Sequence, residues 1–256
     1  MNRRWRSCLA LLGVVAGAAC TEVGTNPNAP VAIELLPPAS PSVVLGDTLR
    51  DSLGMAAPLR VVVFNYKNDT IAGPAPTFLV LDTSGVLTVD RTLGIVVGTK
   101  LGQQIKVVAT VGSLQSIPDT LTVVDTPSVM LNVDSLRGTI DYSFAGGLRD
   151  TTALLRVRLL HLPDSVAVPQ YVVRYTVLHP TGLDNTDSTN IQLVNPAGRP
   201  ALVDTTDASG TTKLGLRITP FTHPFADSVV LEARAATPPG YPVLAPIRYV
   251  LQVTVH

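Results

Sequence analysis

The sequence is poor in cysteine, in aromatic residues and in charge. Its 256 residues include 2 cysteines and 1 tryptophan, with 5% aromatic and 15% charged residues. So few cysteines exclude a cysteine-rich zinc site, which needs three or four of them. The scarcity of aromatic rings gives no support to a sugar-binding platform, because such platforms are built from exposed rings.

The sequence also lacks any stretch with a sustained helical period, which disfavours a parallel α/β fold. Its hydrophobic residues, 46% of the chain, are mostly valine, leucine, alanine and isoleucine, and threonine is plentiful beside them. Residues of this kind favour pleated, half-buried strands. The 21 prolines and 19 glycines supply the frequent turns of an all-β protein. The composition therefore predicts an all-β fold.

From Val31 onward, short apolar segments alternate with turn residues at intervals of about ten residues, the spacing of a β-sandwich. In a first unit the expected strands are 31–37, 59–65, 77–82, 85–90, 104–112 and 119–124. In a second unit they are 154–161, 171–178, 213–219, 228–235 and 247–255. Each has one apolar and one polar face, which predicts two tandem antiparallel β-sandwiches. With a linker around Pro127, the domains are expected at 31–125 and 126–256.

The first residues have the layout of a secretory signal peptide. Three arginines precede an apolar run, Ser7–Ala19, that is shorter than the ~20 residues a transmembrane helix needs. The segment that ends at Cys20 resembles a bacterial lipobox, in which the cysteine is acylated and becomes the first residue of the mature chain. We therefore expect a lipoprotein signal peptide at 1–19 and a tether at 20–30, with Cys20 as the lipidation site. An ordinary signal peptide, cut before an incidental cysteine, stays open as the other interpretation.

Acylation of Cys20 would decide where the protein resides. Cys8 lies inside the signal segment, so Cys20 would be the only cysteine of the exported chain and could form no intramolecular disulfide. Several buried acyl chains, at ~0.8 kcal/mol per methylene, would hold the protein durably on a membrane. The expected location is the bacterial cell envelope, with the chain lipid-anchored to a membrane that faces the periplasm or the exterior.

The formal net charge of the whole chain is zero. Without residues 1–19, which contain three arginines and no acid, 16 basic and 19 acidic residues remain. No basic patch emerges along the sequence, so we expect no nucleic-acid partner.

No group of potential catalytic residues has the spacing that its chemistry needs. The four histidines belong to no His-Glu-x-x-His helix and lie near no Gly-x-Ser-x-Gly elbow. The segment 78–85, "FLVLDTSG", is similar to the Asp-Thr-Gly turn of aspartic proteases, but Ser84 interrupts it, and the proteases need two such turns. We expect a β-turn there, no enzymatic activity and no cofactor.

Two polar loops, "GLDNTDSTN" and "DTTDASG", contain the oxygen ligands that calcium prefers. Neither loop has the EF-hand spacing with its terminal bidentate glutamate. Polar hairpin loops account for both segments, and a calcium site is kept as a second interpretation. Its candidate ligands are Asp184, Asp187, Asp204 and Asp207.

The first unit resembles a bacterial immunoglobulin-like domain of group 2. The residues that carry the resemblance are "VAIEL" from Val31, "LGDTL" from Leu45, the run 85–112 and the closing "DTLTVV" from Asp119. The tryptophan that is frequent in this family is absent, and Phe78 is expected to fill its space.

The second unit is similar to an invasin-type immunoglobulin-like domain of group 1. The similarity rests on "ALVDTTDASGTTKLGLRITP" (201–220) and "DSVVLEARA" (227–235). Together the two resemblances imply immunoglobulin-like sandwiches that act as spacers, adhesin stalks or appended modules, and they specify no ligand.

These features predict a membrane-anchored, non-enzymatic envelope or surface protein that serves adhesion, spacing or assembly through immunoglobulin-like domains. Its partner would be an unidentified protein or glycan, reached through edge strands and end loops. The alternative is a lipoprotein that binds a glycan or an envelope polymer, with or without calcium. A ligand-induced rise in melting temperature would favour the alternative.

Overall fold

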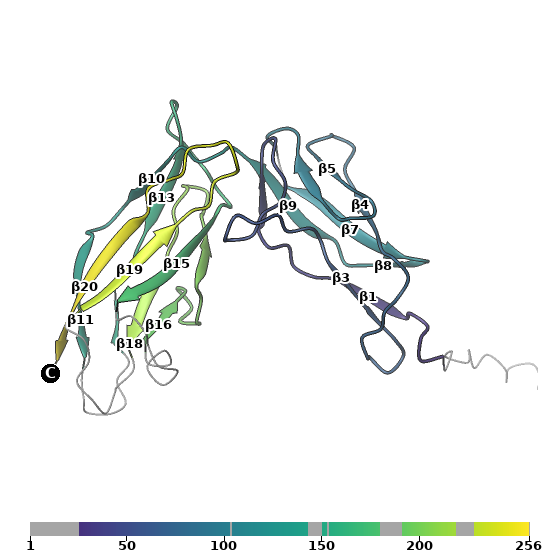
Figure 1. The fold of residues 1–256 in the computed structure, drawn as a ribbon, viewed down its shortest axis with the longest axis horizontal. Helices are drawn as coiled ribbons and strands as arrows, with labels where there is room; N and C mark the ends of the chain where they lie inside the picture. Colours follow the sequence, from purple (N-terminus) through teal and green to yellow (C-terminus); the bar gives the residue numbers. More distant parts are fainter. Residues whose placement is uncertain are drawn as a thin grey trace, which may run out of the picture.

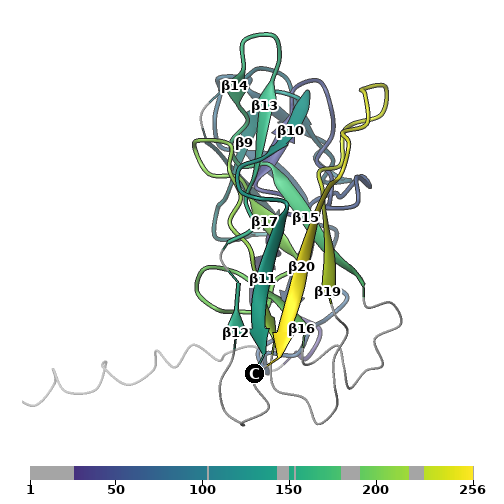
Figure 2. The same cartoon turned by 90° about the vertical axis from the view of Figure 1, so that its left-hand side faces the viewer.

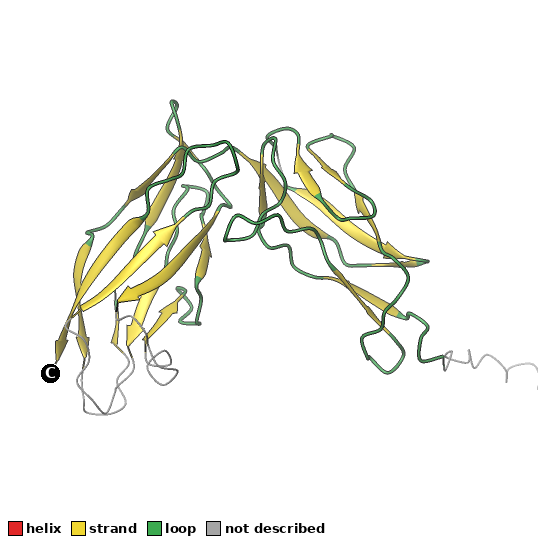
Figure 3. Ribbon diagram, viewed as in Figure 1, coloured by secondary structure: helices red, strands yellow, loops and turns green. Residues whose placement is uncertain are grey.

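The computed structural model describes residues 26–102, 104–142, 150–152, 154–179, 191–218 and 228–255. Within these ranges every regular element is a β-strand, as Figure 3 shows, and no helix has the length and hydrophobicity to cross a membrane. The strands form two sandwiches, each around its own hydrophobic core (Figure 1). The predicted all-β fold with two tandem sandwiches is confirmed.

The first sandwich is built from nine short strands. One layer is the sheet β2-β9-β7-β4, with β8 paired to β7, and the pairs β1–β3 and β5–β6 face it. Inward residues of both layers fill the core, among them Phe78, Val96 and Leu121. The strands are β1 (Ala32–Leu35), β2 (Ser42–Val44), β3 (Val61–Phe64), β4 (Thr77–Val80), β5 (Leu87–Val89), β6 (Val96–Gly98), β7 (Ile105–Val111), β8 (Leu114–Gln115) and β9 (Asp119–Val124).

The second sandwich pairs a five-stranded sheet, β11-β20-β19-β15-β17, with two three-stranded sheets, β10-β13-β14 and β12-β18-β16. Single bridges from Leu155 to Leu214 and from Arg158 to Thr211 join the two smaller sheets into one layer. The strands are β10 (Val129–Asn132), β11 (Arg137–Tyr142), β12 (Asp150–Thr151), β13 (Val157–His161), β14 (Val166–Ala167), β15 (Val172–His179), β16 (Ile191–Val194), β17 (Val203–Thr205), β18 (Gly215–Ile218), β19 (Ser228–Arg234) and β20 (Ile247–Val255).

Two strand pairs differ from the wholly antiparallel sheets that the sequence predicted. The pair β2–β9 and the pair β11–β20 are parallel, so in each sandwich an early strand lies beside the last one. Successive strands cross between two facing layers, which is the arrangement of an immunoglobulin-like sandwich. In both sandwiches the first strand pairs elsewhere, β1 with β3 and β10 with β13, and the second strand, β2 or β11, lies parallel to the last.

The alternation that the sequence predicted is confirmed in the strands that build the cores. In β7 every second side chain from Ile105 to Val111 is buried in the core, and Val108 on the opposite face is buried as well. In the second sandwich Leu155, Val157 and Leu159 are buried in the same way. Side chains on opposite faces of a strand alternate with a period of two, so one set of positions builds the core and the other meets solvent.

Two tyrosines lie fully buried in the second core, and both hydroxyls have partners. The Tyr175 hydroxyl is 2.6 Å from Thr212 Oγ1, and Tyr249 donates to the carbonyl oxygen of Arg156 at 2.8 Å. Burial raises the pKa of both phenols, which keeps them neutral. These bonds offset the cost of burying a hydroxyl group.

Gly210 occupies a turn where only glycine fits. Its φ is +75°, and a Cβ there would lie 2.5 Å from the carbonyl oxygen of Leu159. We expect Gly210→Ala to lower the unfolding free energy of the second sandwich by about 2 to 4 kcal/mol, because backbone strain and a clash add together.

The control is Gly240→Ala, at a φ of +88° with no heavy atom within 4 Å of the added Cβ. Because only the strain remains, it should lose about 1 kcal/mol. Urea denaturation of both variants measures the difference, and equal losses would contradict the steric explanation.

The two sandwiches meet at one end and diverge from there (Figure 1). The described chain begins at the far end of the first sandwich, and its C-terminus lies at the far end of the second (Figure 1). The two ends of the described chain therefore lie at opposite ends of the molecule, along its longest dimension.

Candidate functional site

Three of the residues predicted to carry function, Cys20, Asp184 and Asp187, lie outside the described residues. Asp204 lies in β17, where its carboxylate accepts a hydrogen bond from the backbone N–H of Lys213 at 2.5 Å. Asp204 therefore joins β17 to the segment that precedes β18.

Asp207 lies in the turn after β17, and its carboxylate is bonded within its own hairpin. Ser209 Oγ donates to it at 2.6 Å, and Lys213 Nζ lies 2.9 Å away. The Ser209 hydroxyl and then the Lys213 ammonium hold the pKa of this carboxyl well below its usual range. No group of three or more His, Cys, Asp or Glu side chains suited to a metal ion occurs in the described part of the chain. The calcium site stays a prediction.

The segment 78–85 contains the end of β4 and most of the turn to β5, and a turn is what the sequence predicted there. Asp82 Oδ1 accepts a hydrogen bond from the backbone N–H of Ser84 at 2.7 Å. Its carboxylate therefore stabilises an exposed turn, in the manner of an Asx-turn.

The connection between the sandwiches is bonded to the second one. The backbone N–H of Ser128 donates to Leu160 at 2.8 Å, and His161 Nδ1 donates to the carbonyl oxygen of Thr126 at 2.7 Å. Two residues of the first sandwich, Val44 and Val124, pack into the core of the second. This shared packing restricts the motion that a short linker alone would allow.

Further contacts join the sandwiches away from the connection. Ser42 Oγ donates to the carbonyl oxygen of Gln170 at 2.7 Å, and a Cβ on Gly54 would lie 3.1 Å from the Cβ of Ala236. The backbones therefore approach each other closely at two separate places.

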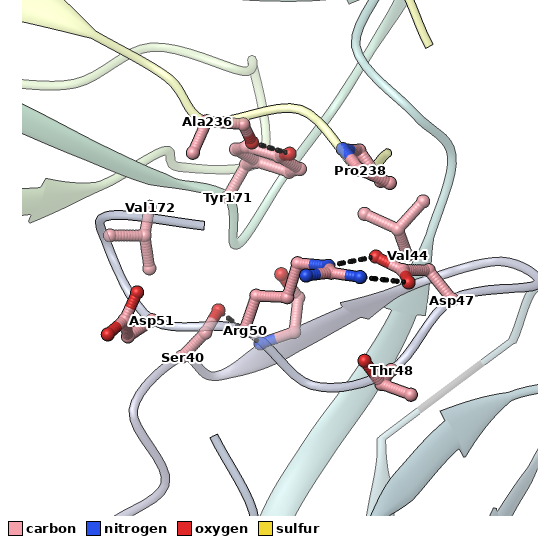
Figure 4. A pocket seen from close by; sticks show the side chains of 11 residues that line it. Ser40, Val44, Asp47, Thr48, Arg50, Asp51, Tyr171, Val172, Ala236 and Pro238 are labelled. Carbon is pink, nitrogen blue, oxygen red and sulfur yellow. Dashed lines mark hydrogen bonds and ion pairs between the residues drawn. The ribbon is translucent and has the colours of Figure 1, made fainter. Parts of the chain in front are cut away.

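Arg50 organises the first sandwich's side of this contact. Its Nε and Nη2 donate to the two carboxylate oxygens of Asp47 at 2.6 and 2.9 Å, and its Nη1 donates to the carbonyl oxygen of Gly54 at 2.8 Å. Figure 4 shows the guanidinium turned to Asp47, with Tyr171 and Pro238 of the second sandwich across a cavity of about 30 Å³. A bidentate pair of this kind holds both side chains in one geometry.

Tyr171 forms the opposite wall of that cavity. Its hydroxyl donates to the carbonyl oxygen of Ala236 at 2.5 Å (Figure 4). Burial, reinforced by the nearby charge of Asp47, raises the pKa of this phenol, so it remains a neutral donor. The contact thus combines a fixed ion pair, a buried aromatic ring and aliphatic packing.

The outer face of the five-stranded sheet carries a second feature, a cluster of arginines around one glutamate, which the sequence did not predict. Arg248 Nε donates to Glu232 at 2.8 Å, and Arg234 Nε donates to the other carboxylate oxygen. The Glu232 side chain is 3% exposed, whereas those of Arg234 and Arg248 are 61% and 62% exposed. Hydrogen bonds from Arg234 and then Arg248 lower the pKa of Glu232.

This lowered pKa predicts a pH dependence of stability. A carboxyl group whose pKa is lower in the folded state stabilises the fold above its unfolded pKa, roughly 4.3 for glutamate, and this contribution is lost as the pH falls through the folded value. Glu232→Gln should therefore lose about 1 kcal/mol at neutral pH and little at acid pH. Denaturant unfolding of both proteins between pH 7 and pH 3 measures this, and parallel stability curves would contradict it.

The sequence matches no established protein-family profile and no curated protein. Among solved structures, the chain is similar to the Yersinia pseudotuberculosis adhesin InvE, at 16% identity and a TM-score of 0.31, over 88% of this chain and 58% of that one. Surface layer protein SbsC, domains 1–6, aligns at 13% identity and a TM-score of 0.32, over 89% and 29%. Zebrafish RET cadherin-like domains 1 to 4 align at 15% and 0.33, over 71% and 40%. The chain therefore spans only part of the length of each of these proteins.

Proposed function

We propose that this chain is a non-enzymatic lipoprotein of the bacterial envelope, anchored through Cys20, that serves adhesion, spacing or assembly. The first sandwich, which resembles the group 2 domains, would act as the spacer. The second, which resembles the invasin-type domains, would be held away from the membrane as the part that meets a partner. The short tether from Cys20 ends where the first sandwich begins, so the anchor and the second sandwich would lie at opposite ends of the molecule.

The observation that carries this proposal is the contact between the sandwiches. A spacer holds its outer domain at a defined place only if the angle between its domains is fixed. Most interfaces between domains of one chain permit relative motion unless they are large and hydrophobic. Here Val44 and Val124 share the second core, and Ser42 bonds to the second sandwich. Arg50, held by three hydrogen bonds within the first sandwich, lines the cavity opposite Tyr171. These contacts favour a unit that behaves as one rigid body.

Metabolic labelling with a fatty-acid analogue tests the anchor. We expect label in the wild-type chain and none in Cys20→Ser, which should move from the membrane fraction to the soluble fraction. Cys8→Ser is the matched control and should keep both the label and the membrane location. Absence of label from the wild type would contradict lipid anchoring.

Protease treatment of intact cells then distinguishes the two sides of the envelope. Digestion of the labelled wild-type chain from outside would establish a surface protein. Label together with protection would establish a protein that faces the periplasm, and the partner would then be an envelope component.

A further inference from the structure

Three arginines from three different strands lie on the outer face of the five-stranded sheet, whose strands β11, β20, β19 and β15 lie side by side in Figure 2. Arg174 of β15 lies directly opposite Arg234 of β19, and Glu232 of β19 lies directly opposite Arg248 of β20. Like charges directly opposite each other destabilise a sheet. Glu232 offsets part of this repulsion, and Arg174 Nη1 also donates to Ser52 Oγ of the first sandwich at 3.5 Å. The four side chains, three arginines and one glutamate, nevertheless keep a net charge of +2, which an anionic partner would neutralise. We call Arg174, Arg234, Arg248 and Glu232 the arginine face.

Glu232 fixes the orientation of two of these arginines, Arg234 and Arg248, before a partner binds. Each donates its Nε to the glutamate, and within the described residues neither guanidinium makes another hydrogen bond or ion pair. The terminal amino groups are therefore free to form bidentate bonds with a carboxylate. Because the side chains are already oriented, less conformational entropy is lost on binding.

An aliphatic groove borders the arginine face at Arg248. It measures about 460 Å³, and apart from Arg248 and Asn132 its walls are apolar. Leu131 and Leu136 on its rim are 46% and 43% exposed. The remaining apolar walls are Met130, Pro246 and Ile247. Cationic and aliphatic surfaces thus lie side by side.

We propose that the arginine face and this groove together dock an acidic peptide segment of a partner protein. Its carboxylates would bind Arg234 and Arg248, and an aliphatic side chain would enter the groove. A peptide supplies both groups within a few residues. A sugar polymer fits less well because the groove is lined by aliphatic groups and contains no aromatic ring on which a sugar could stack.

This proposal specifies the class of partner for the function proposed above. It depends on that function only for the location in the envelope at which the chain meets the partner. Binding itself needs no membrane anchor. Failure of the purified chain to bind the peptide would contradict only the docking proposal, and absence of lipid label at Cys20 would contradict only the proposed anchoring.

Fluorescence anisotropy with a labelled peptide of alternating glutamate and leucine, twelve residues long, is the test. We expect saturable binding that weakens as salt is added. The matched probes replace leucine by serine or glutamate by lysine, and both should bind at least about tenfold more weakly, since aliphatic burial and charge each contribute.

Variants locate the binding on the surface. Arg248→Gln should weaken binding of the glutamate–leucine peptide by about tenfold. Leu136→Ser, at an exposed position that leaves the core intact, should weaken it severalfold. Arg60→Gln in the first sandwich, exposed and remote in sequence from this face, is the control and should leave it unchanged. Circular dichroism verifies that each variant is folded.

Several results would overturn the proposal. Equal binding by the wild type and both face variants would place the peptide elsewhere. Binding of phosphatidylglycerol vesicles, polygalacturonate or duplex DNA without binding of the peptide would identify another occupant. Self-association of the chain that both face variants abolish, without peptide binding, would identify a second copy as the occupant.

Discussion

Replacing Leu216 with alanine is expected to lower the unfolding free energy of the second sandwich by about 2 to 5 kcal/mol. Leu216 lies in β18 and is fully buried at the centre of the second core. The substitution removes three carbon atoms from a tightly packed site, so the lost transfer free energy and the cost of a residual cavity add together. This loss is a large fraction of the total stability of a domain of this size.

Scanning calorimetry of the full chain measures this effect separately for the two sandwiches. The melting temperature of the second sandwich should fall strongly. That of the first should fall less, through the packing of Val44 and Val124 into the second core. Leu202→Ala, at a leucine that is 54% exposed, is the matched control and should change stability by less than about 0.5 kcal/mol. Equal effects of the two substitutions would contradict the assignment of the core.

Arg50→Ala is expected to destabilise the first sandwich by about 1 to 3 kcal/mol and to loosen its contact with the second. The Asp47 carboxylate, whose side chain is 14% exposed, would lose both of its bonds to Arg50, and the Gly54 carbonyl would lose its donor. A polar group left without a partner when it is largely buried costs more than the bond itself contributed. The loss of unfolding free energy is smaller than for a fully buried ion pair, because the Arg50–Asp47 pair is partly exposed to solvent.

Scanning calorimetry of Arg50→Ala beside a control variant measures this effect. Arg60→Ala, at an exposed arginine beside β3, is the control and should have little effect. Arg50→Lys should recover only part of the loss, because an ammonium group cannot make the bidentate pair and the third bond together. If Arg50→Ala behaves like the control, the ion pair does not support the contact.

Much of the fold could be predicted from the sequence because its long strands are amphipathic. In β7 and around Leu155 in the second sandwich, alternation alone identified the buried face. The shortest strands, such as β8 and β14 with two residues each, show no alternation because they are too short to display a period. The parallel pairs also could not be predicted, since pairing between the two ends of a sandwich depends on tertiary packing.

The candidate site was less accessible to sequence analysis than the fold. Arg174, Arg234 and Arg248 are scattered along the chain, and only the register of β15, β19 and β20 brings them together. The sequence therefore suggested no basic patch, and the structure reveals one. Asp47 likewise has the local pattern of a turn residue, while its partner Arg50 and the second sandwich give it a role in the contact.

The central claim is that the two sandwiches form one unit with a fixed angle, because presentation of the arginine face at a set distance from the anchor depends on it. Pulsed electron paramagnetic resonance between spin labels at Thr88→Cys of β5 and Gln252→Cys of β20, both exposed, tests it directly. The chain would carry Cys8→Ser and Cys20→Ser, which leaves no other cysteine. We predict a single narrow distance distribution that matches the fold in Figure 1. A broad distribution would contradict the claim, since the sandwiches would then move independently on a flexible connection.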